Sequence, residues 1–311
     1  MRPVVSALAK ALPFLMRLRL ASLGSPVTET AALGVLPGQP RPQLIAALYE
    51  GLERKAKADG VRLLAVKDVP NAQFDARGAA RTAGLNPMSS LPAAVLDMAG
   101  ITSEEAYWER LSYSTRKDFR RKLKKAGGIG IERLTDLAPH ANDIDRLYEA
   151  TRARSDLQFE RLTWRYFQAV LEQMGDDAAL FLYSAGGEAI GFNLLIGSGG
   201  AWVDKYFCAD ARGPEHNLYV VSWLQNVRFA MSRGAHRLVA GQTAYEVKLK
   251  FGCRLEPTTI FFRHRWWAAN AILALASRYL GAEETDPTLR RAPGMTPAMA
   301  DGPLPANGGL G

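Results

Sequence analysis

Residues Trp202–Gly252 read WVDKYFCADARGPEHNLYVVSWLQNVRFAMSRGAHRLVAGQTAYEVKLKFG. The stretch begins with a strand-like run, followed by a turn of the size that holds a phosphate. A long helix over Leu218–Arg233 and a second strand over Arg237–Ala240 come next. A loop that carries Tyr245 and Lys248 then leads into a third element. We expect the rest of the chain to build a scaffold or a substrate wall around this stretch.

Three strand-like runs lead up to the long helix. Two short glycine-rich connections, Gly186-Gly187 and Gly197–Gly200, separate them. Short connections of this kind between apolar runs predict antiparallel strands that form a meander. The three runs are Ala179–Ser184, Ala189–Ile196 and Ala201–Phe207.

The first hundred residues alternate between strand patterns and helix patterns, as an α/β domain does. A connector rich in proline and glycine precedes the first long helix. The predicted elements are a strand over Phe14–Ala21, a helix over Pro42–Ala58, a strand over Val61–Val66, a helix over Ala72–Ala83 and a strand over Ala93–Leu96.

Glu104–Lys125 is predicted to be helical, with a break at Ser112–Thr115. Thr102 and Glu105 have the spacing of a capping box, which would start this helix. Gly130–Leu134 follows as a predicted edge strand. Further along the chain we predict helices over Asp143–Arg154 and Thr163–Met174 and a strand over Thr258–Arg263.

A dense basic run occupies the second half of that helical segment. Arg116, Arg120 and Lys124 are four residues apart, so they share one face of the helix. They are candidate contacts to an anionic substrate or to RNA phosphates. The alternative is a solvated helix face, and no RNA-recognition motif accompanies the run.

The composition is that of a globular protein with a positive charge. The chain has 311 residues and a net charge of +8, which favours an anionic partner such as nucleic acid, a phosphate-rich cofactor or an acidic membrane surface. The two cysteines, Cys208 and Cys253, lie far apart and no Cys/His cluster surrounds them. We therefore expect no metal site and no disulfide framework, and a reducing cytoplasm as the compartment.

Both ends of the chain raise the question of membrane contact. Lys10, Arg17 and Arg19 interrupt the apolar N-terminal segment, so we expect neither a cleaved signal nor a spanning helix. A short helix is expected there, with a basic amphipathic surface helix as the alternative. Trp266–Leu280 is expected to be a packed terminal helix, with an interfacial membrane helix as the alternative. From Glu283 onward the tail is rich in proline, glycine and alanine, and we expect it to be disordered.

The order of three strands, a helix and a strand is similar to the core of the GNAT acyltransferase superfamily. Two stretches extend the resemblance to its FemAB-like branch. The first, YWERLSYSTRKDFRRKLKKAG (Tyr107–Gly127), resembles the helix pair that opens the second half of FemAB-like proteins. The second, GQTAYEVKLKFG (Gly241–Gly252), resembles their signature Gly-x-x-x-Tyr-x-x-Lys-x-x-Phe-Gly.

This resemblance covers about Gly24–His264. It implies an α/β fold in which a GNAT-like mixed sheet is flanked by helices, with two GNAT-like lobes. We expect a degenerate N-terminal lobe over residues 1–100, an acyltransferase lobe over residues 101–282 and a disordered tail over residues 283–311.

The resemblance also implies transfer of an acyl or aminoacyl group to an amine, without a metal, from acyl-CoA or aminoacyl-tRNA. In ordinary GNAT enzymes a glycine-rich turn before the long helix holds the CoA pyrophosphate through backbone N–H groups. Here the turn has one glycine, and Pro214 removes a donor. Its candidate cofactor-binding residues are Arg212, Gly213, His216 and Asn217. The alternatives are an exposed His216 and an Asn217 that only caps the helix.

Four residues are candidates for catalysis. Lys248 matches the lysine of the family signature, and its ammonium could pair with a donor phosphate or stabilise a developing oxyanion. Tyr245 could donate a proton or orient the acceptor, and Glu246 could act as a general base. Asp204, on the last strand of the meander, could act as a base or bind the amine. The alternatives are a surface lysine, a tyrosine packed in the core and an exposed glutamate.

We therefore expect an acyltransferase that moves an acyl group from acyl-CoA to an amine of a small molecule or precursor. The first alternative is an aminoacyl-tRNA-dependent peptidyltransferase that acts on a cell-wall precursor. The second is a non-catalytic protein that binds a membrane surface. We place the protein in the cytoplasm, with peripheral contact to the inner face of the membrane as an option.

Overall fold

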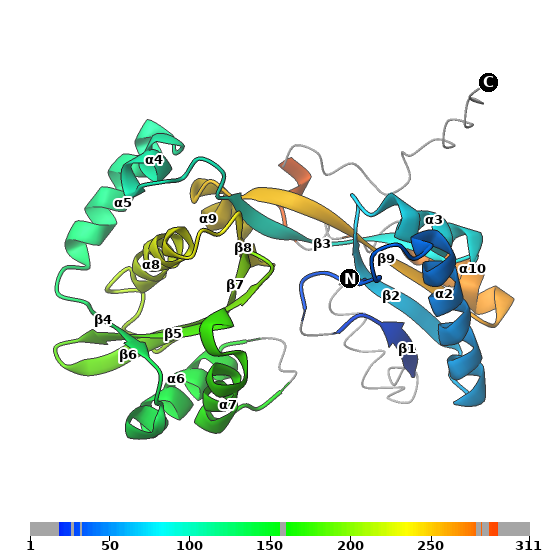
Figure 1. Cartoon of the computed structure of the whole chain (residues 1–311), viewed down its shortest axis with the longest axis horizontal. Coiled ribbons are helices and arrows are strands. Elements are labelled where there is room, and N and C mark those ends of the chain that lie inside the picture. Colours follow the sequence, from blue (N-terminus) through cyan, green and yellow to red (C-terminus); the bar gives the residue numbers. More distant parts are fainter. Residues whose placement is uncertain are drawn as a thin grey trace. The chain divides into compact units, whose positions relative to one another are not determined.

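The computed structural model describes residues 19–25, 28–31, 33–155, 160–277, 281 and 286–291. These residues divide into two compact units (Figure 1). The first unit contains residues 1–93 and 256–311, and the second contains residues 94–255. The first boundary falls close to the expected residue 100. The second differs from the expected division, because the chain after Leu255 returns to the first unit instead of completing the second.

The first unit is built on the strand order β1-β2-β9-β3. β1 (Leu20–Leu23) runs parallel to β2 (Leu63–Pro70). β2 runs antiparallel to β9 (Arg254–His264), and β3 (Asn86–Asp97) follows β9 in the order. The returning β9 therefore supplies an inner strand of the first unit, which explains why the second boundary differs from the expected one.

Two helices, α2 (Arg41–Ala58) and α3 (Phe74–Thr82), pack against this sheet. The expected helices over Pro42–Ala58 and Ala72–Ala83 are thus present, with small shifts at their ends. The buried core between the helices and the sheet includes Ile45, Leu52, Leu64, Val66 and Phe261.

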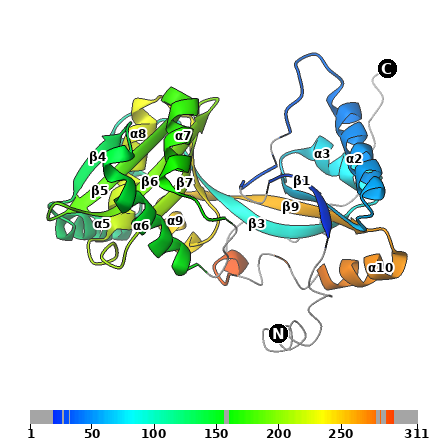
Figure 2. The same cartoon turned by 90° about the horizontal axis from the view of Figure 1, so that it is seen from below.

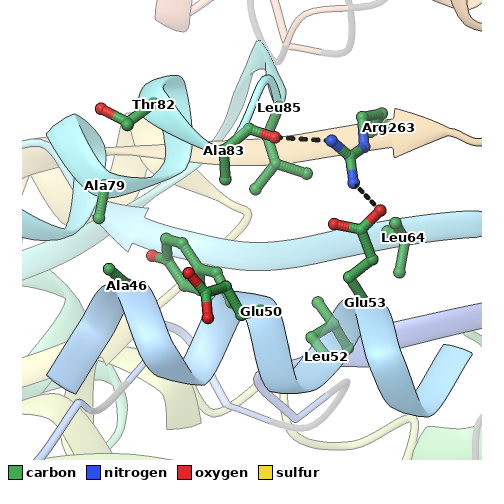
Figure 3. Close-up of a pocket in the computed structure, with 11 residues that line it drawn as sticks. Ala46, Glu50, Leu52, Glu53, Leu64, Ala79, Thr82, Ala83, Leu85 and Arg263 are labelled. Carbon is green, nitrogen blue, oxygen red and sulfur yellow. Dashed lines mark hydrogen bonds and ion pairs between the residues drawn. The ribbon is translucent and has the colours of Figure 1, made fainter. Parts of the chain in front are cut away.

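A pocket of about 170 Å³ lies between α2, α3 and β9 (Figure 3). Arg263 of β9 forms an ion pair with Glu53 of α2 at 2.7 Å. The same guanidinium donates to the carbonyl oxygen of Ala83, at the end of α3, at 2.8 Å. One side chain of β9 therefore ties the returning segment to both helices of the first unit.

The second unit has the strand order β3-β8-β7-β6-β5-β4. Strands β4 to β7 are joined as antiparallel neighbours, so the predicted meander and the predicted edge strand are both present. β8 runs parallel to β7 and antiparallel to the end of β3. The bounds are β4 Gly130–Leu134, β5 Ala178–Ala185, β6 Glu188–Ser198, β7 Ala201–Ala209 and β8 Arg237–Gly241.

Helices cover both faces of this sheet (Figure 1). Leu195 and Phe181 point to the face that packs with α8, α4 and α5, whereas Leu194 and Leu180 point to the face that packs with α6 and α7. This alternation is the normal consequence of the two-residue period of a strand. The helices are α4 Glu104–Glu109, α5 Tyr113–Lys125, α6 Ala141–Ala153, α7 Trp164–Met174 and α8 Leu218–Ser232.

Two local predictions are wrong. The cap of α4 is Ser103, whose Oγ accepts a hydrogen bond from the N–H of Ala106 at 3.1 Å, and not the expected Thr102–Glu105 box. The Tyr/Lys segment, expected as a loop, forms a short helix, α9 (Tyr245–Lys250). Local patterns did not separate these possibilities, because both Thr102 and Ser103 are suitable caps.

The C-terminal helix α10 (Trp267–Ala276) follows β9 (Figure 2). It differs from the expected packed helix, because none of its side chains is buried within the described part of the chain. The expected end of this helix at Leu280 lies outside the described residues. In the predicted tail only 286–291 is described, and Leu289 there is fully buried. The N-terminal segment 1–18 lies outside the described residues. Among the helices that the structure does describe, none has the length and apolar character needed to cross a bilayer.

Candidate functional site

The candidate site lies where β7 and β8 separate. The two parallel strands are paired only over Ala201–Val203, opposite Arg237–Val239. Beyond Val203, no described residue of β7 is in register with β8, although β7 continues to Ala209. On its other edge, β8 pairs with β3 from Arg237 to Gly241. The two strands therefore diverge from a shared start within the second unit.

A β-bulge in β7 determines which side chains of this strand point to the α8 face of the sheet. Leu194 is opposite Tyr206 and Leu195 is opposite Asp204, so Lys205 is an extra residue in the strand. Without the bulge, Trp202 and Phe207 would point to opposite faces, because Phe207 is five positions further along the strand, an odd offset. With it, both pack with the core on the α8 face.

Asp204 points to the same face as Trp202. Burial, followed by the Asp204 carboxylate, raises the pKa of Tyr183 well above its usual value, and Tyr183 belongs to the core on the α8 side. The sequence left open which of the neighbours Asp204 and Lys205 faces the covered side. The bulge places Asp204 there.

A pocket of about 410 Å³ opens beside the diverging strand, between β7, α8 and α9. This volume lies in the range of small-molecule sites. Its wall is mostly apolar, and charged or polar side chains stand at its rim. The apolar wall includes Phe207, Leu218, Tyr219, Val220 and Val247, and the rim includes Lys122, Arg154, Asp210 and Asn217.

Backbone N–H groups of the turn before α8 donate hydrogen bonds to acceptors within the same turn. Five backbone N–H groups between β7 and α8 donate to acceptors within residues 210–217, and they belong to Arg212, Gly213, His216, Asn217 and Leu218. In ordinary GNAT turns such groups are offered to a pyrophosphate. In this conformation these five donors already have partners, so they are not free for an anion.

Gly213 is needed here for packing. A Cβ atom at this position would lie 2.9 Å from the Cβ of Ala209 and 3.3 Å from the carbonyl oxygen of Asp210. The glycine therefore lets the turn lie against the end of β7, and it lines the pocket. That it binds a cofactor stays a prediction.

Arg212 belongs to an ion-pair network beside the pocket. Its guanidinium donates to Asp210 and Glu188, and Arg146 donates to the same Asp210 carboxylate at 2.9 Å. Burial raises the pKa of Asp210, but the hydrogen bonds from Arg212 and Arg146 outweigh it and hold that pKa below its usual value. Arg212 itself is not among the residues that line the pocket, so its predicted contact with a cofactor remains a prediction.

The other two residues of the turn have different positions. His216 is partly buried and does not line the pocket. Asn217 stands at the N-cap position of α8, but its side chain makes no cap hydrogen bond. Its Nδ2 donates instead to the carbonyl oxygen of Lys122 at 3.4 Å, and its φ of +50° is a conformation that asparagine tolerates. The capping role expected for its side chain is therefore wrong. Asn217 lines the pocket, and its contact with a cofactor stays a prediction.

Two rim cations were missed at the level of the sequence. Lys122 lies on α5 and pairs with Asp118 at 2.7 Å. Arg154 follows α6, and its guanidinium donates to the carbonyl oxygen of Ala209 at the end of β7. The Asp118–Lys122 spacing was visible, but no sequence signal connects Arg154 with Ala209, because the two are far apart along the chain.

The predicted basic stripe on α5 divides into two parts. Arg116 donates to the carbonyl oxygens of Trp108 and Leu111, so it satisfies the end of α4. Arg120 and Lys124 are exposed on α5 and do not line the pocket. The prediction that this stripe binds substrate remains a prediction, and Arg116 already has a structural role.

The family-matched residues lie on α9. Tyr245 and Lys248 are 1% and 4% exposed, so neither is a surface residue. The Lys248 ammonium donates to the carbonyl oxygen of Gln242 at 2.8 Å. Glu246 is exposed and pairs with Lys250 at 2.6 Å. Of the three candidates on this helix, two therefore point into the second unit and one points to solvent.

The loop before α9 has an unusual backbone. Gly241, Thr243 and Ala244 have φ values of +75°, +67° and +48°. A β-branched residue such as threonine is rarely found at positive φ, and strain of this kind collects at functional sites. Lys248 bonds to a carbonyl within this loop, so it helps to hold the loop in its conformation.

The charges of Asp204 and Lys248 affect the pKa values of two buried groups, Tyr219 and Cys253. Burial, with smaller contributions from the Asp204 carboxylate and the Cys253 thiol, raises the pKa of Tyr219. Burial also raises the pKa of Cys253 to about 12, against the opposing effect of Lys248. Of these residues, Tyr219 lines the pocket. Tyr219 and Cys253 were not singled out in the sequence as members of the site. Within the described ranges, no three His, Cys, Asp or Glu side chains gather as metal ligands would.

Comparison with known proteins identifies the class. Residues 113–249 match the acetyltransferase (GNAT) domain. The expected fold class, a mixed sheet flanked by helices with a GNAT-like core, is thereby confirmed. The match also favours an enzyme over the non-catalytic alternative.

Three solved structures share the fold. FemX is 14% identical, with a TM-score of 0.55 over 79% of this chain and 80% of its own. The C-terminal domain (DUF2156) of a lysylphosphatidylglycerol synthetase from Agrobacterium fabrum is 13% identical, with a TM-score of 0.54 over 78% and 79%. L-PGS from Bacillus licheniformis is 10% identical, with a TM-score of 0.53 over 78% of each chain. The resemblance to the FemAB-like branch is therefore confirmed at the level of the fold.

A curated relative from Mycobacterium tuberculosis, "Putative 8-amino-7-oxononanoate synthase 2", is 27% identical over 235 residues. The alignment covers 71% of this chain and 30% of the relative. The chain therefore spans less than a third of the length of that relative.

Proposed function

We propose that this protein is an N-acyltransferase that moves an acyl group from an acyl-CoA thioester to an amine. The single observation that carries the proposal is the pocket of about 410 Å³ in the GNAT domain, with an apolar wall and a cationic rim. An acyl thioester with a phosphorylated carrier has two parts that match these: an apolar arm for the wall and an anionic part for the rim.

The donor would lie with its acyl–pantetheine arm along Phe207, Tyr219 and Val247, and its phosphates would pair with Lys122 and Arg154. Guanidinium and ammonium groups form charge-assisted hydrogen bonds with phosphate oxygens. This assignment uses side chains because the five N–H donors of the turn already have partners.

In the reaction, the amine nitrogen attacks the thioester carbonyl carbon and forms a C–N bond. The C–S bond then breaks, the ammonium proton passes to a base, and the sulfur leaves as the CoA thiol with a proton. Asp204 is the proposed base, because it faces the α8 side of the sheet, whereas Glu246 is exposed and paired with Lys250. Tyr245 is the proposed proton donor, and Lys248 is a positioning residue that holds the loop before α9.

Thermal unfolding with CoA and with short- and long-chain acyl-CoAs tests the proposal. A ligand at about 100 times its dissociation constant stabilises the folded state by about 2.7 kcal/mol, which shifts the midpoint measurably. The unfolding midpoint of the wild type should rise with the ligand. Lys122→Met/Arg154→Met should bind the same ligand at least about tenfold more weakly, because each charge-assisted contact contributes about 1.5–3 kcal/mol.

Lys124→Met is the matched control, because this lysine lies on the same helix and does not line the pocket. Its response should equal that of the wild type. If no CoA compound shifts the midpoint of the wild type, the acyl-CoA proposal is wrong.

Aminoacyl-tRNA is the second candidate donor. The fold likeness to FemX supports it, together with the exposed Arg120 and Lys124 on α5. In that case the acceptor would be a cell-wall or other precursor amine. Binding of aminoacyl-tRNA should then survive replacement of Arg212 and His216. Replacing Arg120 and Lys124 should weaken the binding of aminoacyl-tRNA. The slope of log affinity against log salt concentration should fall by about one for each phosphate contact that is lost.

The proposed compartment is the cytoplasm. Cys208 and Cys253 are both buried, unbridged thiols, and thiols remain reduced in that compartment. Fractionation of cells that produce the full chain, followed by immunoblotting, tests this assignment; recovery outside the cytoplasmic and membrane-associated fractions would contradict it.

A further inference from the structure

Helix α10 directs its one amide side chain to the sheet and exposes large apolar side chains. Asn270 is its one amide side chain, among alanine, isoleucine, leucine and tryptophan residues. The Oδ1 of Asn270 accepts hydrogen bonds from the Nδ2 of Asn86 at 2.9 Å and from the N–H of His264 at 3.0 Å. The polar side chain of this helix is therefore directed to β3 and β9, where a helix in water would place apolar residues.

Several large apolar side chains of α10 point to solvent, whereas Leu273 is partly buried. Trp267, Ile272 and Leu275 are 79%, 68% and 58% exposed, and the preceding Trp266 is 59% exposed. Apolar surface in water is unfavourable in proportion to its area, and a contiguous exposed patch of this kind marks a contact surface. Transfer of these side chains from water to an apolar phase lowers the free energy.

Two cations stand at the tryptophan end of the helix. The N–H of Arg265 donates to the carbonyl oxygen of Arg62 at 2.8 Å, so the two residues are neighbours, and both are exposed. The adjacent Arg263 has a different orientation, because its guanidinium is held by Glu53 in the pocket of the first unit. Tryptophan beside arginine is typical of helices at the boundary between water and acyl chains.

We propose that α10, together with Trp266, Arg62 and Arg265, is a docking helix that lies on an anionic phospholipid surface. The tryptophans and Ile272 would enter the acyl-chain boundary, and the two guanidinium groups would pair with lipid phosphates. The net charge of +8 favours the same surface. This inference does not depend on the identity of the acyl donor.

Flotation of the full chain with vesicles tests the proposal. One set contains phosphatidylcholine alone, and the other contains phosphatidylcholine mixed with phosphatidylglycerol. The wild type should bind the anionic vesicles and bind the neutral ones weakly. Trp266→Ser/Trp267→Ser should lower the partition coefficient about tenfold or more, because the apolar contact is removed. Arg62→Gln/Arg265→Gln should remove the preference for the anionic vesicles.

Phe74→Ser is the matched control, because Phe74 is 71% exposed in the same unit but lies on α3. It should bind vesicles as the wild type does. Unchanged thermal midpoints in all variants show that the fold is retained, and Ile272→Ser provides a second test of the same face. Absence of vesicle binding by the wild type overturns the proposal, as does equal binding by the tryptophan variant.

Two further outcomes also overturn it. One is a dimer in sedimentation velocity that the tryptophan substitutions abolish, without any binding to vesicles, which would assign the face to a second copy of the chain. The other is tryptophan fluorescence that iodide quenches equally in the wild type and in Trp266→Ser/Trp267→Ser without vesicles, which would mean that the chain itself covers the face.

Discussion

Lys248 shows how a side chain can matter for a site without standing in the pocket. It is 4% exposed, and its ammonium donates to Gln242 in a loop with two non-glycine residues at positive φ. We expect Lys248→Met to lower the free energy of unfolding by about 1–3 kcal/mol, because the buried donor is lost while the stem is kept. Turnover should fall at least about tenfold, since the loop is mispositioned. Urea unfolding and initial rates measure the two effects.

Lys250→Met is the control for this prediction. Lys250 lies on the same helix, is exposed and pairs with Glu246 at 2.6 Å. An exposed pair of this kind contributes little, so the unfolding free energy of Lys250→Met should stay close to that of the wild type. An unchanged turnover in Lys248→Met would remove Lys248 from the site altogether.

The individual residues of the site were only partly predictable. The signature led to Tyr245 and Lys248, and three-residue spacing on a helix places both on one buried face of α9. The facing of Asp204 could not be predicted, because it depends on a bulge that exists only in the pairing of β6 with β7. The rim cation Arg154 could not be found either, since its contact with Ala209 joins two separate elements.

At the scale of elements, the turn between β7 and α8 is the feature most sensitive to substitution. Gly213→Ala should lower the free energy of unfolding by about 1–3 kcal/mol, because the new Cβ would lie 2.9 Å from that of Ala209. Donor binding should weaken with it, since both residues line the pocket. Chemical denaturation, followed by titration with the best CoA ligand under native conditions, checks both parts.

Gly78→Ala is the matched control for the turn. Gly78 lies in the middle of α3, and a Cβ added there would meet no atom within 4 Å outside its own helix backbone and chain neighbours. Alanine there should leave stability unchanged or raise it by about 0.4–1 kcal/mol, because the unfolded chain loses freedom. A Gly213→Ala protein as stable as Gly78→Ala would show that the turn can move away from β7.

For the whole molecule, the return of the chain through β9 should decide whether the first unit folds. Deletion of residues 256–311 removes Phe261 from the core and Arg263 from α2 and α3. Loss of one buried phenylalanine costs about 3–5 kcal/mol, which is comparable to the total stability of a small unit. Limited proteolysis should then cut within residues 41–85, whereas the full chain resists.

Deletion of residues 292–311 alone is the control, because it keeps every element that the structure describes. It should resist protease as the full chain does. If the deletion of 256–311 also resists, the first unit does not need β9 and the division into two units is incorrect.

The sequence by itself determined the meander, the long helix α8, the edge strand and the GNAT-like core of the second unit. These features follow from local signals: two-residue alternation, glycine-rich connections and a helix that ends at glycine. Only the tertiary structure decided the facing of Asp204, the partners of Lys248, the two cations at the pocket rim and the return of β9. Each of these depends on contacts between segments distant in sequence, and the energy of such contacts is set by strand register and packing and not by the residue types alone.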